Sequence, residues 1–163
     1  MTGITAVEKQ FGWDILQDLI HVPSRNHRRG SSKVCPQLVQ DQDSDIFAVC
    51  GKFGDLKHSL TECLASRDKF SFLREILETF LDRKISTEEV IFLSFRHYDE
   101  KKIKMGTWFV VKSLGYIFRN IKSECEEMVL VLKQELYYHQ LLERGFVPKK
   151  YLLEMLEIVE NWD

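Results

Sequence analysis

The fold class depends on residues 90–111, VIFLSFRHYDEKKIKMGTWFVV, in which two apolar runs flank a polar, lysine-rich centre. The runs VIFLSF and TWFVV are rich in β-branched and aromatic residues, as strands are, and Gly106 lies between them at a turn. A small β-hairpin is therefore one interpretation, and it would make the fold α+β. Against it, Ser86 and Glu89 have the S-x-x-E spacing of a capping box, which favours a helix from about residue 87 to 98.

Apolar residues repeat at helical spacing through most of the remaining chain. Residues 67–84 have the clearest stripe, with Asp68 as an expected N-cap. Further on, the pattern predicts either one helix over about 107–144 or two helices that break near Asn120, and Pro148 suits the start of a last helix. We therefore predict a mainly α fold, an irregular bundle of about five to seven helices. The stripe of 67–84 contains Phe72, Leu73, Ile76, Leu77, Phe80 and Leu81.

The length of 163 residues suits one globular domain with a short appendage. We predict an N-terminal helix over 1–21, a basic-then-acidic loop or linker over 22–45, and a helical domain over 46–163. No apolar run reaches the roughly 18 residues of a membrane helix, and the N-terminus does not resemble a secretory signal. We therefore expect an intracellular protein, cytoplasmic or nuclear, without a membrane partner.

Several helical stretches are apolar on all sides, which requires burial in the core or against a partner. A small domain has limited interior, so part of this surface is expected to form an interface. We predict a non-enzymatic protein–protein interaction, adaptor or regulatory protein that contacts a protein partner and is a candidate for self-association. The candidate contact residues are Trp108, Phe109, Val110, Tyr137, Tyr138 and Trp162.

The loop SRNHRRGSSK, within residues 24–33, is a compact basic patch that could bind phosphates or an acidic surface. A nucleic-acid-binding accessory factor is therefore the alternative function, although the net charge of −2 does not favour it. Ser31 follows two arginines and is a candidate phosphorylation site, where a phosphate would nearly neutralise the patch. The basic residues are Arg25, Arg28, Arg29 and Lys33.

A third alternative is an enzyme in which His97 works with Asp99 or Glu100 as an acid–base pair. In either secondary structure these side chains do not form a buried, oriented pair, so a solvated turn is the favoured interpretation.

The cysteines are widely spaced, which favours free thiols and no cofactor. Cys35, Cys50, His58 and Cys63 could supply four zinc ligands, but the gaps are 14, 7 and 4 residues. Structural zinc sites usually contain close ligand pairs such as C-x2-C, so the spacing argues against zinc without excluding it.

Overall fold

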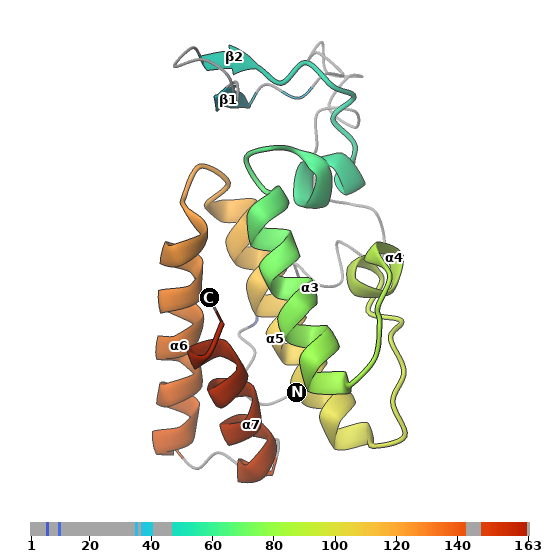
Figure 1. Ribbon diagram of the computed structural model, residues 1–163, viewed down its shortest axis with the longest axis vertical. Coiled ribbons are helices and arrows are strands. Elements are labelled where there is room, and N and C mark those ends of the chain that lie inside the picture. Colours follow the sequence, from blue (N-terminus) through green and yellow to red (C-terminus); the bar gives the residue numbers. More distant parts are fainter. Residues whose placement is uncertain are drawn as a thin grey trace.

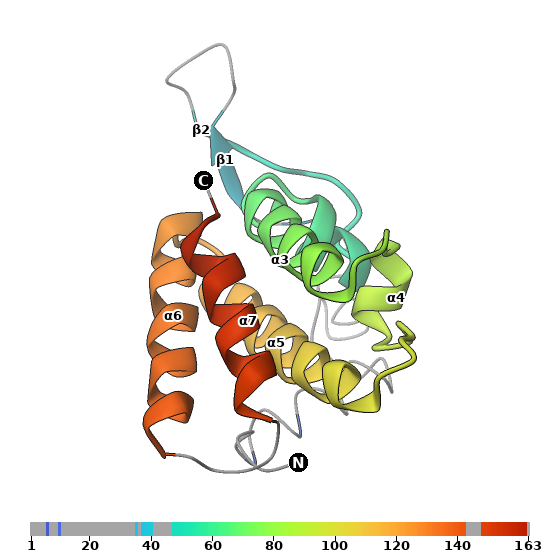
Figure 2. The same ribbon diagram turned by 60° about the horizontal axis from the view of Figure 1, so that its bottom comes forward.

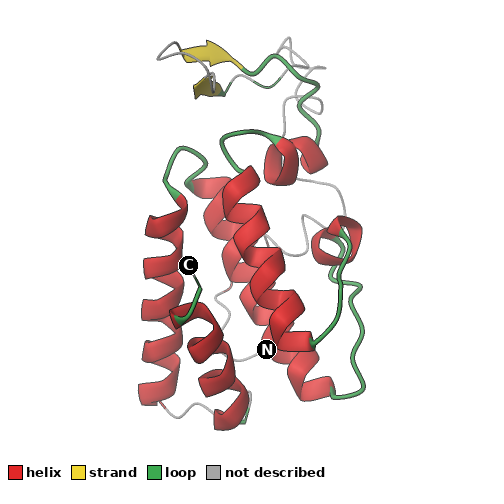
Figure 3. Cartoon of the chain, in the orientation of Figure 1, coloured by secondary structure: helices red, strands yellow, loops and turns green. Residues whose placement is uncertain are grey.

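The computed structural model describes residues 6, 10, 35, 37–40, 47–142 and 148–162. Within these residues the fold is mainly α, as predicted, with six helices and two short strands (Figure 3). In chain order the elements are β1 (Leu38–Gln40), β2 (Phe47–Val49), η2 (His58–Glu62), α3 (Arg67–Leu81), α4 (Thr87–Ile91), α5 (Glu100–Arg119), α6 (Cys125–Leu142) and α7 (Lys149–Glu160).

Four long helices form the body of the molecule. Helices α3, α5, α6 and α7 run alternately down and up, and each packs against the next, with α7 closing the ring against α3 (Figures 1 and 2). The short helix α4 lies to one side of α3, and η2 precedes α3 at its N-terminal end. The two strands form an antiparallel pair beyond η2, at the end of the bundle. This arrangement is the irregular helical bundle that the sequence predicted.

The core lies between α3 and α5, where the largest fully buried side chains meet. Gly106 permits the close approach, because a Cβ at this position would lie 3.0 Å from Leu77 Cδ1 and 3.2 Å from Phe95 Cε2. The predicted apolar stripe of α3 is entirely buried. It packs with Met105, Trp108, Phe109, Leu114 and Ile117 of α5.

Residues 90–111 contain the end of one helix and the start of another, and no β-hairpin. The Ser86 capping box is present, because Ser86 Oγ accepts from Glu89 N–H at 3.1 Å and Glu89 Oε2 accepts from Ser86 N–H at 2.9 Å. Helix α4 ends at Ile91, before the predicted end near residue 98. Leu93 has a left-handed φ of 52°, a conformation that cannot continue a right-handed α-helix. Helix α5 begins at Glu100, so the run TWFVV is central helix.

Of the two alternatives for residues 107–144, the structure has the break near Asn120, and a buried lysine stabilises it. The ammonium of Lys69 donates to the carbonyls of Ala65 and Ile121, each at 2.9 Å, and also to the carbonyl of Ser123. Burial lowers the pKa of this ammonium. Lys69 therefore joins the start of α3 to the turn between α5 and α6, where backbone carbonyls have no helical partner.

The predicted domain boundaries are only partly covered by the described residues. Of the N-terminal helix over 1–21, only Ala6 and Gln10 are described, and both are helical. Strand β1 belongs to the predicted linker 22–45 but pairs with β2 of the following segment. No helix in the described part of the chain is long and apolar enough to cross a membrane.

The close contact at Gly106 predicts opposite effects for two alanine substitutions within α5. Alanine gains up to about 1 kcal/mol over glycine in a helix, so Gly115→Ala, which meets only the flexible Arg119 guanidinium, should stabilise the fold. Gly106→Ala should be less stable than Gly115→Ala by at least about 1 kcal/mol, because it overpacks the core. Urea unfolding followed by circular dichroism measures both values. Equal free energies of unfolding for the two variants would show that the close contact at Gly106 does not limit how α5 packs.

Candidate metal centre

Hydrogen bonds of the β1–β2 pair bring two cysteines side by side. The pairing continues beyond the strands, because Cys50 N–H donates to the Gln37 carbonyl at 2.8 Å and Cys35 N–H donates to the Lys52 carbonyl at 2.7 Å. Gly51 N–H donates to the Cys35 carbonyl at 3.2 Å, and Gly51 has a φ of 67°, which favours glycine. Cys35 and Cys50 are therefore held next to each other despite their separation in sequence.

The π-helical turn η2 positions the other two side chains. Cys63 N–H donates to the His58 carbonyl at 2.8 Å, which is the i to i+5 bond of a π-turn. In an α-helix, side chains five residues apart would be rotated by about 140° from each other. The wider π-turn instead lets His58 and Cys63 face the same side. The start of the turn is held by Asp55 Oδ1, which accepts from His58 N–H at 2.7 Å.

The four side chains converge on one point at the end of the bundle. The Sγ atoms of Cys35 and Cys63 are 3.7 Å apart, and Cys50 Sγ lies 3.4 Å from His58 Nε2. All four potential ligand atoms lie within 4.8 Å of one another. Cys35, His58 and Cys63 are buried, and Cys50 is half-buried. The cluster is therefore preformed and largely shielded from solvent.

Two of the separations, between Cys35 and Cys63 and between Cys50 and His58, match the edges of a tetrahedral zinc site. Zn–S bonds of about 2.3 Å and Zn–N bonds of about 2.0–2.1 Å set edges of about 3.8 Å between two sulfurs and about 3.5 Å between sulfur and nitrogen. The distance of 3.7 Å between Cys35 and Cys63 is much longer than the roughly 2.05 Å of a disulfide. Burial raises the pKa of the Cys63 thiol to about 12, so without a cation this thiol stays protonated. Three cysteines and one histidine are a usual donor set of structural zinc sites.

Sequence spacing did not reveal this cluster. The gaps of 14, 7 and 4 residues argued against zinc because close ligand pairs were expected, but tertiary structure supplies the proximity instead. The pairing of β1 with β2 brings Cys35 next to Cys50, and the π-turn brings His58 next to Cys63. Neither short strands nor a π-turn has a strong sequence signature, so the composition Cys3His was the only available signal.

Cys125 lies outside the cluster, and its surroundings do not favour a reactive thiolate. Its thiol is half-buried at the start of α6 and lies 3.9 Å from the Asp68 carbonyl. Burial raises the pKa of Cys125 to about 11, so its nucleophilic thiolate is scarce at neutral pH.

The structure gives His97, Asp99 and Glu100 local structural roles. His97 Nδ1 accepts from Asp99 N–H at 2.9 Å, and the imidazole stacks on Tyr98. The Asp99 carboxylate caps α5 by accepting from Lys101 N–H at 2.9 Å, and its other oxygen accepts from the Tyr151 hydroxyl. Glu100 is exposed. These contacts do not pair the imidazole with either carboxylate.

The predicted partner-binding residues divide into two groups. Tyr137 and Tyr138 are exposed on α6, and Trp162 is half-buried beyond the end of α7. The other three side chains fill the core of the bundle, which leaves them no surface for a partner. These are Trp108, Phe109 and Val110, each completely buried.

The basic patch and the candidate phosphorylation site lie outside the described residues. They are Arg25, Arg28, Arg29, Lys33 and Ser31. Their proposed contacts with nucleic acid or with a kinase therefore stay predictions.

Comparisons with known proteins assign no family to this chain. No protein-family profile matches it, and neither a curated protein nor a solved structure is significantly similar to it. The geometry of the chain's own residues therefore carries the functional inference.

The contact between Asp99 and Tyr151 predicts a pH-dependent contribution to stability. The hydrogen bond from Tyr151 holds the pKa of Asp99 below its ordinary value, so the charged form stabilises the fold. This contribution is present above the unfolded-state pKa of about 3.9 and is lost as the pH falls through the folded-state pKa. Asp99→Asn, which preserves the helix cap, should therefore be less stable than wild type at about pH 6, and the difference should shrink toward about pH 2.5.

Urea unfolding at both pH values measures this difference. Glu100→Gln removes a charge from the same helical turn without touching Tyr151, and it serves as the control. A constant Asp99→Asn deficit at both pH values would contradict the assignment.

Proposed function

We propose that the protein is a zinc-binding, non-enzymatic helical domain that acts as a protein-interaction module. The observation that carries this proposal is the convergence of Cys35, Cys50, His58 and Cys63 within 4.8 Å. Thiolate and imidazole ligands in a tetrahedral arrangement favour zinc over the hard cations magnesium and calcium, which prefer oxygen.

The proposed zinc is structural. Catalytic zinc sites usually have three protein ligands and leave the fourth position for water or substrate. Here four protein ligands would complete the tetrahedron, so no position remains for a substrate. His97 and Asp99 are engaged in local hydrogen bonds within the turn before α5, which also favours a non-enzymatic function.

The zinc would attach the β1–β2 pair to the bundle. Two strands of three residues each are too short to be stable by themselves. Cys35 and Cys50 come from this pair, whereas His58 and Cys63 come from the turn that leads into α3. Bound metal would therefore join the two parts, and its binding free energy would contribute to folding.

The interaction role rests on the surface of the helices. Helix α6 exposes four large hydrophobic side chains, and an exposed group of this kind on one helix favours contact with a partner; they are Leu130, Val131, Tyr137 and Tyr138. We also propose a cytosolic or nuclear location, because three cysteine ligands would stay reduced in that compartment.

Zinc content tests the metal assignment directly. The chain, purified under reducing conditions without added metal, should carry about one zinc per molecule by inductively coupled plasma mass spectrometry. Cys35→Ser and Cys63→Ser should lose most of it. Cobalt substitution should give the thiolate charge-transfer band and the ligand-field bands of a tetrahedral site.

Cys125→Ser is the matched control, because it removes a cysteine outside the cluster and should retain the zinc. Wild-type protein with reduced thiols and no bound zinc would overturn the assignment. An equal loss of zinc from Cys125→Ser would do the same.

Metal removal should loosen one end of the molecule and leave the bundle folded. After chelation, amide hydrogen exchange should accelerate at Cys35, Cys50, Gly51 and Cys63, whose N–H groups are hydrogen-bonded around the site. Amides in the middle of α5 should keep their protection, because the α3–α5 core does not contain the metal. Unchanged exchange at the cysteine amides would contradict a structural role for the metal.

A further inference from the structure

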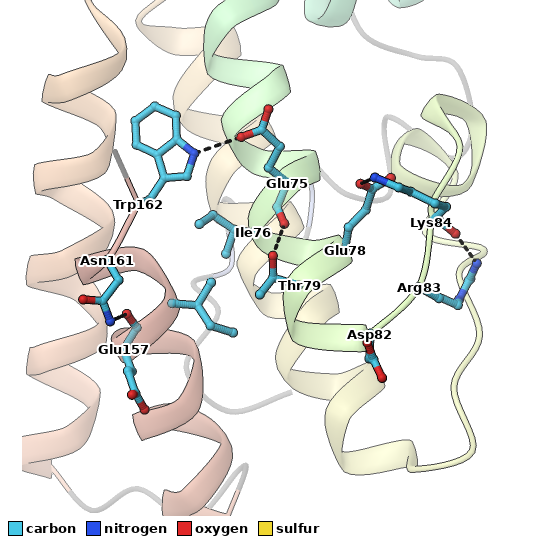
Figure 4. A pocket seen from close by; sticks show the side chains of 11 residues that line it. Glu75, Ile76, Glu78, Thr79, Asp82, Arg83, Lys84, Glu157, Asn161 and Trp162 are labelled. Carbon is cyan, nitrogen blue, oxygen red and sulfur yellow. Dashed lines mark hydrogen bonds and ion pairs between the residues drawn. The ribbon is translucent and has the colours of Figure 1, made fainter.

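A groove lies between α3 and α7, away from the cysteine cluster (Figure 4). It has a volume of about 740 Å³, within the range of clefts that hold ligands or several side chains of a partner. It is lined by the C-terminal half of α3 and by the end of α7, whereas the cluster adjoins the N-terminal end of α3. The two features are therefore separate sites on the same helix.

The floor of the groove is apolar and includes one aromatic side chain. Ile76 is buried at the base, Ile158 is half-buried, and Trp162 lies at one end. The Trp162 ring packs edge-on against Phe72, with ring centroids 4.7 Å apart, and its N–H donates to Glu75 Oε2 at 3.0 Å. These contacts fix the indole in place before any partner arrives.

The rim is acidic on both sides. Glu75 and Glu78 lie one turn apart on α3, Asp82 is the C-cap residue just beyond its end, and Glu157 lies on α7 (Figure 4).

The two cations that line the groove already have partners. Arg83 pairs with Glu89 at 2.6 Å, and Lys84 pairs with Glu78 at 3.0 Å. Among the residues that the structure describes, no basic side chain forms an ion pair with Glu75, Asp82 or Glu157. The groove therefore combines an apolar floor with a rim on which three carboxylates, Glu75, Asp82 and Glu157, have no ion-pair partner among the described residues.

We propose that this groove binds a basic amphipathic helix of a partner protein. The proposal deepens the interaction role given above. Helix-in-groove recognition places the apolar face of the bound helix on the floor of a groove, as the space between α3 and α7 allows. The negative rim then selects Lys or Arg at the edges of that face. Phosphate-bearing ligands, including nucleic acids, would be repelled by the same carboxylates.

The spacing of the rim predicts the spacing of the cations. Asp82, the C-cap residue of α3, lies about two helical turns beyond Glu75, or about 10.5 Å along the helix axis. A bound helix that runs along α3 would therefore present Lys or Arg seven residues apart, with large apolar residues between them. This pattern separates the proposed partner from a generally basic peptide.

Selection from a displayed random library of peptides about 14 residues long, four helical turns, tests the proposal against the full, zinc-loaded chain. We expect enriched peptides with two Lys or Arg residues seven positions apart and with Leu, Ile or Phe between them. An enriched peptide is then measured by fluorescence anisotropy against wild-type and variant proteins. No enrichment, or enrichment of acidic or uncharged peptides, would overturn the proposal.

The groove variant Asp82→Asn/Glu157→Gln removes two rim charges with little structural change. Asp82 has a left-handed φ of 51°, and asparagine tolerates that conformation well. Loss of two exposed ion pairs should weaken binding about fivefold. The control Glu124→Gln/Glu127→Gln makes the same charge change at exposed positions around the start of α6 and should leave the affinity unchanged.

Equal weakening in the groove variant and the control would indicate a general attraction between charges and would overturn the proposal. Ile158→Ser tests the floor and should weaken binding about fivefold, because it removes part of the apolar contact with the bound helix. An unchanged affinity there would also count against the groove. Zinc content is measured on every sample, so that failed peptide binding with zinc present rejects the groove alone, and absent zinc with intact binding rejects the metal site alone.

Discussion

The contact between α3 and α5 is the constraint on which the rest of the structure depends. The apolar face of α3 meets Trp108 and Phe109 of α5 in the fully buried core, and Gly106 lets the two helices approach closely beside Leu77 and Phe95. Once α3 and α5 have packed together, they present the surfaces on which α6 and α7 pack. Helix α6 packs on α5, and α7 closes the ring against α3, which also creates the groove between α3 and α7.

Helix α3 serves both proposed sites because of its position. The π-turn that precedes it supplies His58 and Cys63, and the buried ammonium of Lys69 in its first turn fixes the neighbouring α5–α6 turn. Its other half supplies the acidic rim of the groove. A rigid helix that is buried along one face can hold both sites without coupling them, since about 12 Å of helix separates its first residue from Glu75.

The proposed metal would hold in place a segment that the hydrophobic core does not stabilise. The β1–β2 pair lies beyond the end of the bundle, and its strands are too short to be stable by hydrogen bonding alone. Four ligands that join the pair to the η2 turn would hold this segment without extending the hydrophobic core. Four protein ligands would leave no coordination position for a substrate, which is consistent with a non-enzymatic interaction role.

Local patterns allowed much of the fold to be predicted from the sequence. The 3.6-residue period of α3, the break near Asn120 and the capping box at Ser86 act within a few residues, and the structure contains all three. By contrast, the early end of α4 at Ile91 depends on a left-handed Leu93 that no local pattern indicated.

The sequence by itself determined a helical bundle with a core and a set of cysteines. Only the tertiary structure decided that Trp108 is core and not interface, that Asp99 is a helix cap, and that the side chains of Cys35, Cys50, His58 and Cys63 converge. The physical reason is that burial and metal-ligand geometry depend on distances across the fold, which sequence spacing does not fix.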